Sequence, residues 1–173
     1  MRGVSFRGNM KEIWELYTKD VERSGIYYER GSDAEIPDGL YVLAVEIWIK
    51  VGEDKLLFTK RHPKKFMGLM WEAPGGGVLA EEDGIHGAMR ELMEETGIEL
   101  GVEKFTLLGR HTNYQTIAES YLVRLDALPK LSLQPSEVVD ARLVSDEDIT
   151  NMWELLTPGT QTRYNLYKKQ IFR

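Results

Sequence analysis

The sequence of 173 residues contains no cysteine. This absence excludes disulfides, thiolate metal ligands and a cysteine nucleophile. The sequence also lacks an apolar run of about 20 residues, the length that a membrane-spanning helix requires, and it lacks a signal-peptide pattern. We therefore expect a protein of the reducing cytoplasm, with neither a membrane span nor export.

The chain also has fewer basic than acidic residues. The chain has 22 Lys and Arg against 28 Asp and Glu, so its formal net charge is −6. An acidic chain is poorly suited to bulk binding of nucleic acid, because such binding depends on neutralising phosphates. A small phosphorylated substrate is compatible with this charge, provided that metal ions help the site to accept it.

No feature of the chain marks a domain boundary, since it has no internal repeat, low-complexity tract or linker. A composition of 42% hydrophobic and 29% charged residues is typical of a soluble globular protein. We expect residues 1–173 to form one domain, with residues 1–39 as an N-terminal extension packed on it.

A helix with clustered carboxylates is predicted from about Gly84 to Thr96. Its apolar stripe, at 100° per residue, consists of Ile85, Ala88, Met89 and Leu92. Glu91, Glu94 and Glu95 fall together on another face. Like charges at this spacing cost roughly 0.2–0.5 kcal/mol per pair, and two glycines near the start each weaken the helix by about 1 kcal/mol relative to alanine.

This cluster has two interpretations. Several locally unfavourable choices in one place indicate a functional site. A hard divalent cation such as Mg²⁺ prefers carboxylate oxygens and would turn the repulsion into coordination. The alternative is a solvated acidic face on a surface helix, which is a common feature.

The stretch from Gly76 to Ile98 gives the glutamates a wider context. A glycine, a glutamate, an Arg-Glu-Leu triplet, a glutamate pair and a Gly-Ile pair follow at set offsets: Gly76, Glu82, Arg90, Glu91, Leu92, Glu94, Glu95, Gly97 and Ile98. This pattern resembles the signature of the Nudix hydrolase family at every fixed position. Because so many positions agree, the match is far more specific than a lone glycine motif.

The resemblance implies the fold and the metal site. It implies an α/β/α sandwich with a mixed β-sheet between helices, and Mg²⁺ or Mn²⁺ as cofactor. Glu94 and Glu95 are the first candidates for metal ligands and catalytic residues, followed by Glu91, with Gly75 among the metal ligands.

The resemblance also implies roles for the other fixed positions. Arg90 is expected to orient glutamates by pairing with Glu82 and Glu91, while its side chain projects away from the acidic face. Gly76 and its neighbours would permit positive φ and a close backbone approach. Gly97 would be the left-handed residue that ends the helix.

The activity that follows from the resemblance is metal-dependent hydrolysis of a pyrophosphate bond in a nucleoside diphosphate linked to another group. The metal would polarise phosphoryl oxygens and lower the pKa of an attacking water. A non-catalytic nucleotide-sensing or interaction domain of the same fold is the alternative, because fold does not guarantee function.

Four candidate substrate contacts and one further carboxylate lie outside the signature. Lys60, Arg61 and Lys64 belong to a basic segment in an acidic protein and are candidates for phosphate binding, against the alternative of solvated surface. Tyr114 lies at a distance past the signature where family members select substrate. Glu137, in a late acidic loop, is a candidate for general base or extra metal ligand, or else a surface charge.

The remaining elements follow from periodicity and turn residues. We expect a short helix from about residue 9, a hairpin or strand over 21–30 turning near Ser24 and Gly25, and a loop over 31–39. Further strands are expected at 40–51, 55–60, 104–111, 118–126 and 141–144, and helices at 145–155 and 158–172.

The N-terminal aromatic segment resembles, more loosely, the isopentenyl diphosphate isomerase branch of the same family. The isomerase mechanism uses a cysteine, which this chain lacks, so we do not expect that activity. The aromatic residues are interpreted as core or interface packing, and they could serve a homodimer: Trp14, Tyr17, Tyr27 and Tyr28.

Overall fold

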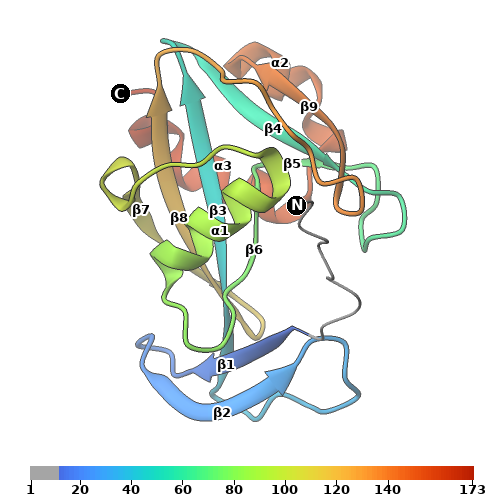
Figure 1. Ribbon diagram of the computed structural model, residues 1–173, viewed down its shortest axis with the longest axis vertical. Coiled ribbons are helices and arrows are strands. Elements are labelled where there is room, and N and C mark those ends of the chain that lie inside the picture. The colour runs from blue at the N-terminus through green and yellow to red at the C-terminus, as the bar shows by residue number, and fades with distance from the viewer. Residues whose placement is uncertain (1–11) are drawn as a thin grey trace, which may run out of the picture.

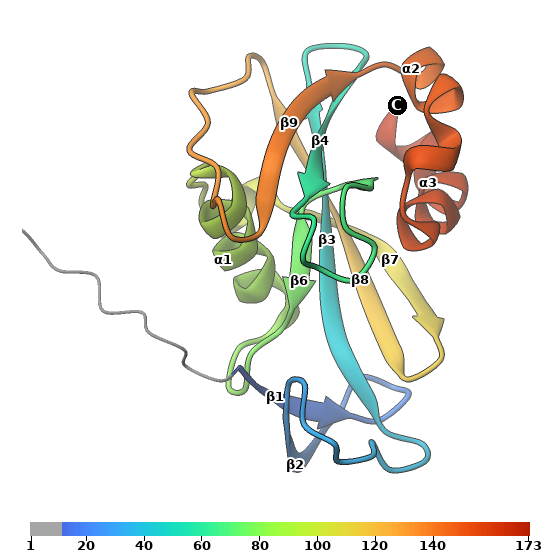
Figure 2. The ribbon, with the colours of Figure 1, turned by 90° about the vertical axis from the view of Figure 1, so that its right-hand side faces the viewer.

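The computed structural model describes residues 12–173 and shows a mixed β-sheet between two helical layers. Helix α1 (Gly84–Thr96) covers one face of the sheet, while α2 (Asp146–Asn151) and α3 (Pro158–Ile171) cover the other (Figures 1 and 2). The predicted α/β/α arrangement is confirmed. No helix within residues 12–173 has the length and apolarity to cross a bilayer.

Within residues 12–173, the sheet contains nine strands, and two short 3-10 turns lie outside it. The strands are β1 (Ile13–Tyr17), β2 (Arg23–Glu29), β3 (Tyr41–Val51), β4 (Lys55–Arg61), β5 (Trp71–Glu72), β6 (Gly75–Gly77), β7 (Thr106–Asn113), β8 (Thr116–Leu125) and β9 (Val138–Val144). The turns are η1 (Val102–Lys104) and η2 (Trp153–Leu155).

Strand β3 organises the sheet. It pairs with β8 in parallel along ten residues, from Val42 opposite Thr116 to Val51 opposite Leu125. It also pairs antiparallel with β1, β4 and β6 at different points along its length. A strand covered on both faces needs an almost continuous apolar run, which is what its sequence supplies.

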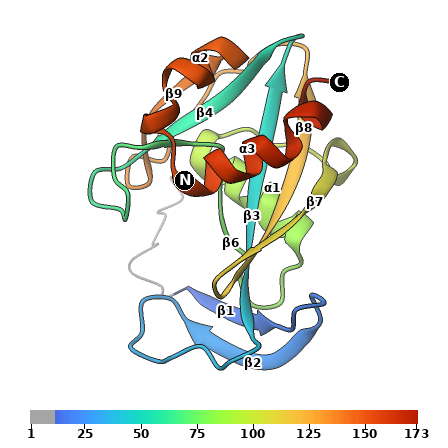
Figure 3. The ribbon, with the colours of Figure 1, turned by 180° about the vertical axis from the view of Figure 1, so that it is seen from behind.

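The hydrophobic core has two halves, one on each face of the sheet. The half beneath α1 includes Leu43, Val45, Ile47, Ile49, Leu57, Ala88, Leu92 and Val123. The half beneath α2 and α3 includes Trp48, Phe58, Trp71, Ile149, Leu156, Tyr164 and Ile171. Figure 3 shows α3 crossing β3 and β8 on the second face.

The N-terminal prediction was wrong in its element type. A helix was expected from about residue 9; residues 9–11 lie outside the described part of the chain, and the rest of that segment is strand β1. Its residues pair with β2 on one side and with β3 on the other, so sheet pairing outweighs the local apolar spacing. The β1–β2 turn lies at residues 18–22, while Ser24 and Gly25 lie where the register shifts.

The later predictions are largely confirmed. Helix α1 has the predicted bounds, the strands agree within a few residues, and the loop over 31–39 is present. The helix expected at 145–155 is shorter, because it ends at Asn151 and a separate 3-10 turn follows. Its start is fixed by Ser145 and Asp148, which form a reciprocal capping box.

Glu46 forms a buried link between the sheet and α3. Its side chain is 3% exposed and accepts two hydrogen bonds from Arg163, at 2.8 and 3.0 Å. Ser120 and Thr160 each donate a further hydrogen bond to it, both at 3.3 Å. The carboxylate is therefore paired and fully surrounded by donors, which is how a buried charge is tolerated.

We predict that Arg163→Ala destabilises the protein by roughly 3 kcal/mol, because it leaves the buried Glu46 carboxylate without its counter-charge. Urea unfolding would measure the change. The exposed Lys169 on the same helix provides the matched control, since Lys169→Ala should change stability by no more than about 0.5 kcal/mol. If Arg163→Ala were as mild as the control, the pair would not be a structural link.

Candidate active site

Helix α1 begins and ends through local side-chain chemistry. Asp83 is its N-cap and accepts a hydrogen bond from the His86 backbone N–H at 3.0 Å. Gly97 ends the helix with φ at 74° and donates its N–H to the Met93 carbonyl, as predicted. The helix is thus fixed at both ends, and its acidic residues project from a defined position.

Packing explains the two glycines that weaken α1. A Cβ at Gly84 would lie 1.7 Å from the Oε2 atom of Glu119, and one at Gly87 would lie 3.0 Å from Val78. Glu119 itself is buried and binds Arg110 and Tyr121 rather than facing the helix carboxylates. Gly84 therefore admits a buried carboxylate beneath the start of the helix.

A pocket of about 210 Å³ lies beside the carboxylates of α1. The predicted residues that line it are Arg61, Gly75, Gly76, Glu91, Glu94, Glu95 and Glu137. Lining residues that the sequence analysis did not select include Glu12, Trp14, Arg30, Lys65, Thr116 and Gln134. The pocket therefore joins the helix carboxylates to cationic side chains and to one aromatic side chain, Trp14.

The glycines of β6 allow close approach rather than unusual backbone angles. None of Gly75, Gly76 and Gly77 has a positive φ, which corrects that part of the prediction. A Cβ at Gly75 would lie 2.1 Å from the Val45 carbonyl oxygen, and one at Gly76 would lie 2.5 Å from the Glu91 carboxylate. The missing side chains let the strand contact both β3 and the helix carboxylates.

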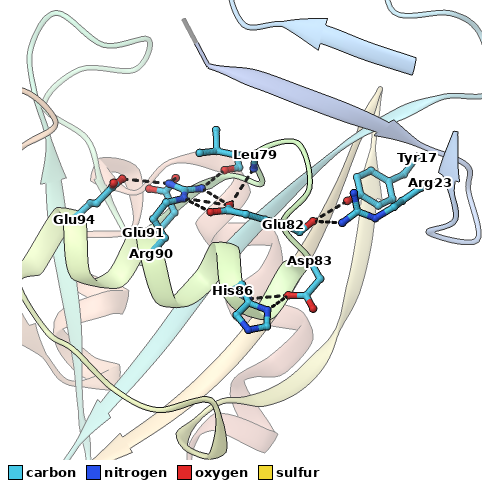
Figure 4. Close-up of polar contacts among 10 residues, drawn as sticks. Tyr17, Arg23, Leu79, Glu82, Asp83, His86, Arg90, Glu91 and Glu94 are labelled. Carbon is cyan, nitrogen blue, oxygen red and sulfur yellow. Dashed lines mark hydrogen bonds and ion pairs between the residues drawn. The ribbon is translucent and has the colours of Figure 1, made fainter. Parts of the chain in front are cut away.

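Arg90 lies among the carboxylates, as Figure 4 shows. Its Nε donates to Glu82 at 2.8 Å, and its Nη1 donates to Glu91 at 2.8 Å and to Glu94 at 3.2 Å. Its Nη2 donates to the Gly77 carbonyl at 2.8 Å. The predicted pairing with Glu82 and Glu91 is confirmed, whereas the expectation that Arg90 projects away from the acidic face is wrong.

The prediction failed because the long arginine side chain can curve around its own helix. The charges of three neighbouring carboxylates favour that conformation. Burial alone would lower the pKa of Arg90, but its hydrogen bonds with Glu82 and the charge of Glu91 outweigh burial and raise it.

Burial shifts the site carboxylates toward the protonated form. Glu95 is 3% exposed, and burial together with the charges of Glu72 and Glu91 raises its pKa to about 8. Burial likewise raises the pKa values of Glu91 and Glu72. The Gly75 N–H donates to Glu95 at 3.3 Å and only partly offsets this shift. The charge of Lys65 also lowers the pKa of Glu95, but it does not compensate for burial.

The donor set suits a hard divalent cation. Three glutamates and the backbone of Gly75 line one pocket, and oxygen donors are the ligands that Mg²⁺ and Mn²⁺ prefer. Within residues 12–173, no three acidic or histidine side chains already converge closely enough to hold an ion. Binding of an ion would therefore bring these side chains closer together, and Arg90 contacts two of them, Glu91 and Glu94.

The basic segment places two cations in the pocket. Arg61 lines it and donates to Glu72 at 2.5 Å, and Lys65 lines it and pairs with Glu137. Lys60 instead lies 5.6 Å from the Trp71 ring centroid, and Lys64 is not a lining residue. The only signal for Lys65 was its membership of the same basic run.

Tyr114, a predicted substrate contact, lies outside the pocket, whereas Trp14 of the N-terminal hairpin lines it. Tyr114 is at the tip of the β7–β8 hairpin, is 93% exposed and does not line the pocket. Trp14 does line it, beside Arg30, whose guanidinium lies 5.7 Å from the indole. The indole Nε1 is buried without a hydrogen-bond partner in the described residues. Chain distance from the carboxylates concealed this contribution.

We predict that Glu95 makes stability depend on pH in metal-free buffer. Its pKa is about 8 in the folded state and about 4.3 in an unfolded chain, so its stabilising contribution is complete below about pH 4 and is lost as pH rises through about 8. Glu95→Gln should remove this loss. The free energy of unfolding of the variant, relative to that of the parent, should therefore increase by roughly 2–3 kcal/mol between about pH 6 and about pH 9.

Urea unfolding with chelator present measures this difference. The exposed Glu99, just beyond the same helix, is the control, and Glu99→Gln should follow the parent at both pH values. If the free energy of unfolding changed with pH to the same extent in the parent and in Glu95→Gln, the raised pKa of Glu95 would not be the cause of the pH dependence.

Comparison with known structures shows where this fold occurs. A Deinococcus radiodurans protein superposes with a TM-score of 0.74 at 17% identity, covering 94% of this chain and 100% of that one. A Francisella tularensis bifunctional NMN adenylyltransferase/ADP ribose pyrophosphatase, solved with AMP and a Mn ion, superposes with a TM-score of 0.64 at 20% identity, covering 76% and 42% of the two chains. At these identities the likeness shows the fold alone.

Sequence comparison goes further. An uncharacterised Nudix hydrolase of Listeria monocytogenes is 27% identical over 141 residues, which cover 80% of this chain and 82% of the relative. The family model described as the NUDIX domain matches residues 40–170. Since that match includes the whole Gly76 to Ile98 stretch and well over half of the chain, this protein belongs to the NUDIX domain family.

Proposed function

We propose that this protein hydrolyses a pyrophosphate bond in a nucleoside diphosphate linked to another group, with Mg²⁺ or Mn²⁺ as cofactor. The family match supports pyrophosphohydrolase activity in general. The observation that carries the specific proposal is the joining of Glu91, Glu94 and Glu95 with the cations Arg61 and Lys65 in one pocket. Carboxylates suit metal ions, and cations suit phosphate oxygens.

In this proposal Glu91, Glu94, Glu95 and the Gly75 carbonyl hold the metal. When bound, the metal would neutralise phosphate charge and lower the pKa of an attacking water. Arg90 would orient Glu91 and Glu94 through the hydrogen bonds it already makes.

The diphosphate would lie against Arg61 and Lys65. Both cations are already paired with pocket carboxylates, Glu72 and Glu137, so an incoming phosphate would exchange for these partners. Release of Lys65 would free the Glu137 carboxylate, which lines the same pocket, to act as general base or extra metal ligand.

The group attached to the diphosphate would lie toward the hairpin end of the pocket, against Trp14 and Thr116. An aromatic surface there suits a nucleoside. The Mn ion and AMP in the Francisella tularensis neighbour are consistent with this class of cofactor and ligand.

We also propose that residues 1–173 form one cytoplasmic domain that binds no nucleic acid. A homodimer is part of the proposal, and sedimentation that shows only a monomer would remove it.

The test is a Mg²⁺-dependent hydrolysis screen over nucleoside triphosphates, ADP-ribose, dinucleotides, diadenosine polyphosphates and nucleotide sugars. We expect one class to be hydrolysed, and Glu94→Gln and Glu95→Gln each to lower kcat/KM by about 100-fold or more, since a metal ion supplies several kcal/mol of transition-state stabilisation.

Glu99→Gln is again the matched control and should keep the parental rate, because Glu99 is exposed and does not line the pocket. Tight nucleotide binding without turnover at any Mg²⁺ or Mn²⁺ concentration would instead support the non-catalytic alternative.

A further inference from the structure

The segment that joins β6 to α1, residues 78–83, has no regular secondary structure. It contains Glu81, a non-glycine residue with φ at 71°, a conformation that is unfavourable for a side chain. It also contains Glu82, whose carboxylate binds Arg90, and Asp83, which caps α1. The position of this irregular segment therefore determines both the start of the helix and the placement of Arg90.

The β1–β2 hairpin holds this segment from outside. The Ala80 N–H donates to the Ile13 carbonyl at 2.8 Å. The Glu82 carbonyl accepts two hydrogen bonds from the hairpin, one from Arg23 Nη2 at 2.6 Å and one from the Tyr17 hydroxyl at 3.3 Å (Figure 4). Two donors from separate strands thus converge on one backbone oxygen.

Arg23 is itself held in place for this contact. Its Nη1 pairs with the carboxylate of Glu15, which is 5% exposed. Its guanidinium lies 5.8 Å from the centroid of the Tyr17 ring, and Tyr17 is also buried. A guanidinium that is fixed by a buried carboxylate and an aromatic face loses little freedom when it donates to the carbonyl.

A continuous series of contacts therefore leads from the hairpin to the helix carboxylates. Arg23 and Tyr17 bind the Glu82 carbonyl, the Glu82 carboxylate binds Arg90, and Arg90 binds Glu91 and Glu94. The hairpin precedes residues 40–170, the part that matches the family model.

We propose that Arg23 and Tyr17 are positioning residues of the active site. They clamp the backbone of Glu82, and through Arg90 they set the arrangement of Glu91 and Glu94. Neither residue lines the pocket, so neither is a catalytic residue. The inference rests on the proposed function only where it takes these glutamates as metal ligands.

The test is equilibrium binding of Mn²⁺, followed by the spin resonance of the free ion in the absence of any substrate. Tyr17→Phe removes only the hydroxyl and keeps the buried ring, while Arg23→Ala removes the stronger donor. We expect Kd for Mn²⁺ to rise by about two- to threefold in Tyr17→Phe and by about fivefold in Arg23→Ala, the range of one hydrogen bond in partly exposed surroundings.

Arg124→Ala is the matched control. Arg124 also donates to a backbone carbonyl, that of Gln170 at 3.4 Å, but it lies away from the pocket. It should leave Kd for Mn²⁺ unchanged, even if it lowers the melting temperature as much as Arg23→Ala does. A change in Kd that merely follows the melting temperature across all three variants would overturn the proposal.

A double-mutant cycle identifies the route of the effect. Glu82→Gln weakens the link to Arg90, so Arg23→Ala should have little further effect on Kd in that background. Fully additive effects, or an unchanged Kd in Arg23→Ala alone, would overturn the proposal.

The binding measurement also separates this inference from the proposed function. If the parent binds Mn²⁺ but hydrolyses nothing, the hydrolase proposal fails, while the effect of Arg23 and Tyr17 on Kd for Mn²⁺ can still be measured. If hydrolysis depends on Glu94 and Glu95 but Arg23→Ala binds Mn²⁺ with the parental Kd, the hydrolase proposal is supported and the positioning role of Arg23 is overturned. If the parent binds no Mn²⁺, the proposal that Arg23 and Tyr17 position metal ligands is overturned.

Discussion

The site depends on holding several like-charged carboxylates together in one pocket. The structure achieves this with one guanidinium, that of Arg90, which contacts Glu82, Glu91 and Glu94 and also the Gly77 carbonyl. An arginine suits this task because its planar fork offers five donors and stays charged when buried. Its hydrogen bonds offset part of the repulsion that the helix spacing imposes.

The mixed sheet supplies a backbone carbonyl of strand β6 to which this guanidinium binds. Strand β6 is three glycines long and pairs with β3 from Ala44 opposite Gly77 to Glu46 opposite Gly75. A side chain would collide with the β3 backbone at Gly75, with the Glu91 carboxylate at Gly76 and with the Trp14 indole at Gly77. Glycine therefore brings a strand backbone within hydrogen-bonding distance of helix side chains, and Gly75 and Gly77 supply an N–H and a carbonyl to the site.

The charges around the pocket are paired in the structure, yet they belong to different elements. Arg61 and Glu72 come from β4 and β5, whereas Lys65 and Glu137 come from two loops. Burial raises the pKa of Glu95, as it raises those of Glu91 and Glu72, and the charges of these two neighbours add to the shift at Glu95. A divalent cation bound among these carboxylates would favour their ionised forms, and this is the physical basis of the metal proposal.

Several features could be predicted from the sequence because they depend on short-range spacing. Residues 84–96 form the expected helix, Gly97 ends it, and Glu91, Glu94 and Glu95 line one pocket, because neighbours on a helix are set by the 3.6-residue period. Strand β3 was also readable, since a strand buried on both faces requires an unbroken apolar run.

The distant residues that join the helix at the site could not be predicted in this way, because tertiary contacts select them. The segment at 13–17 became a strand because β2 and β3 offer it hydrogen-bonding partners, and that pairing brought Trp14 to the pocket and Tyr17 to the Glu82 carbonyl. Lys65 entered the pocket and Tyr114 did not, although both lie in segments that looked suitable. Such contacts depend on sheet register and loop path, which local periodicity does not encode.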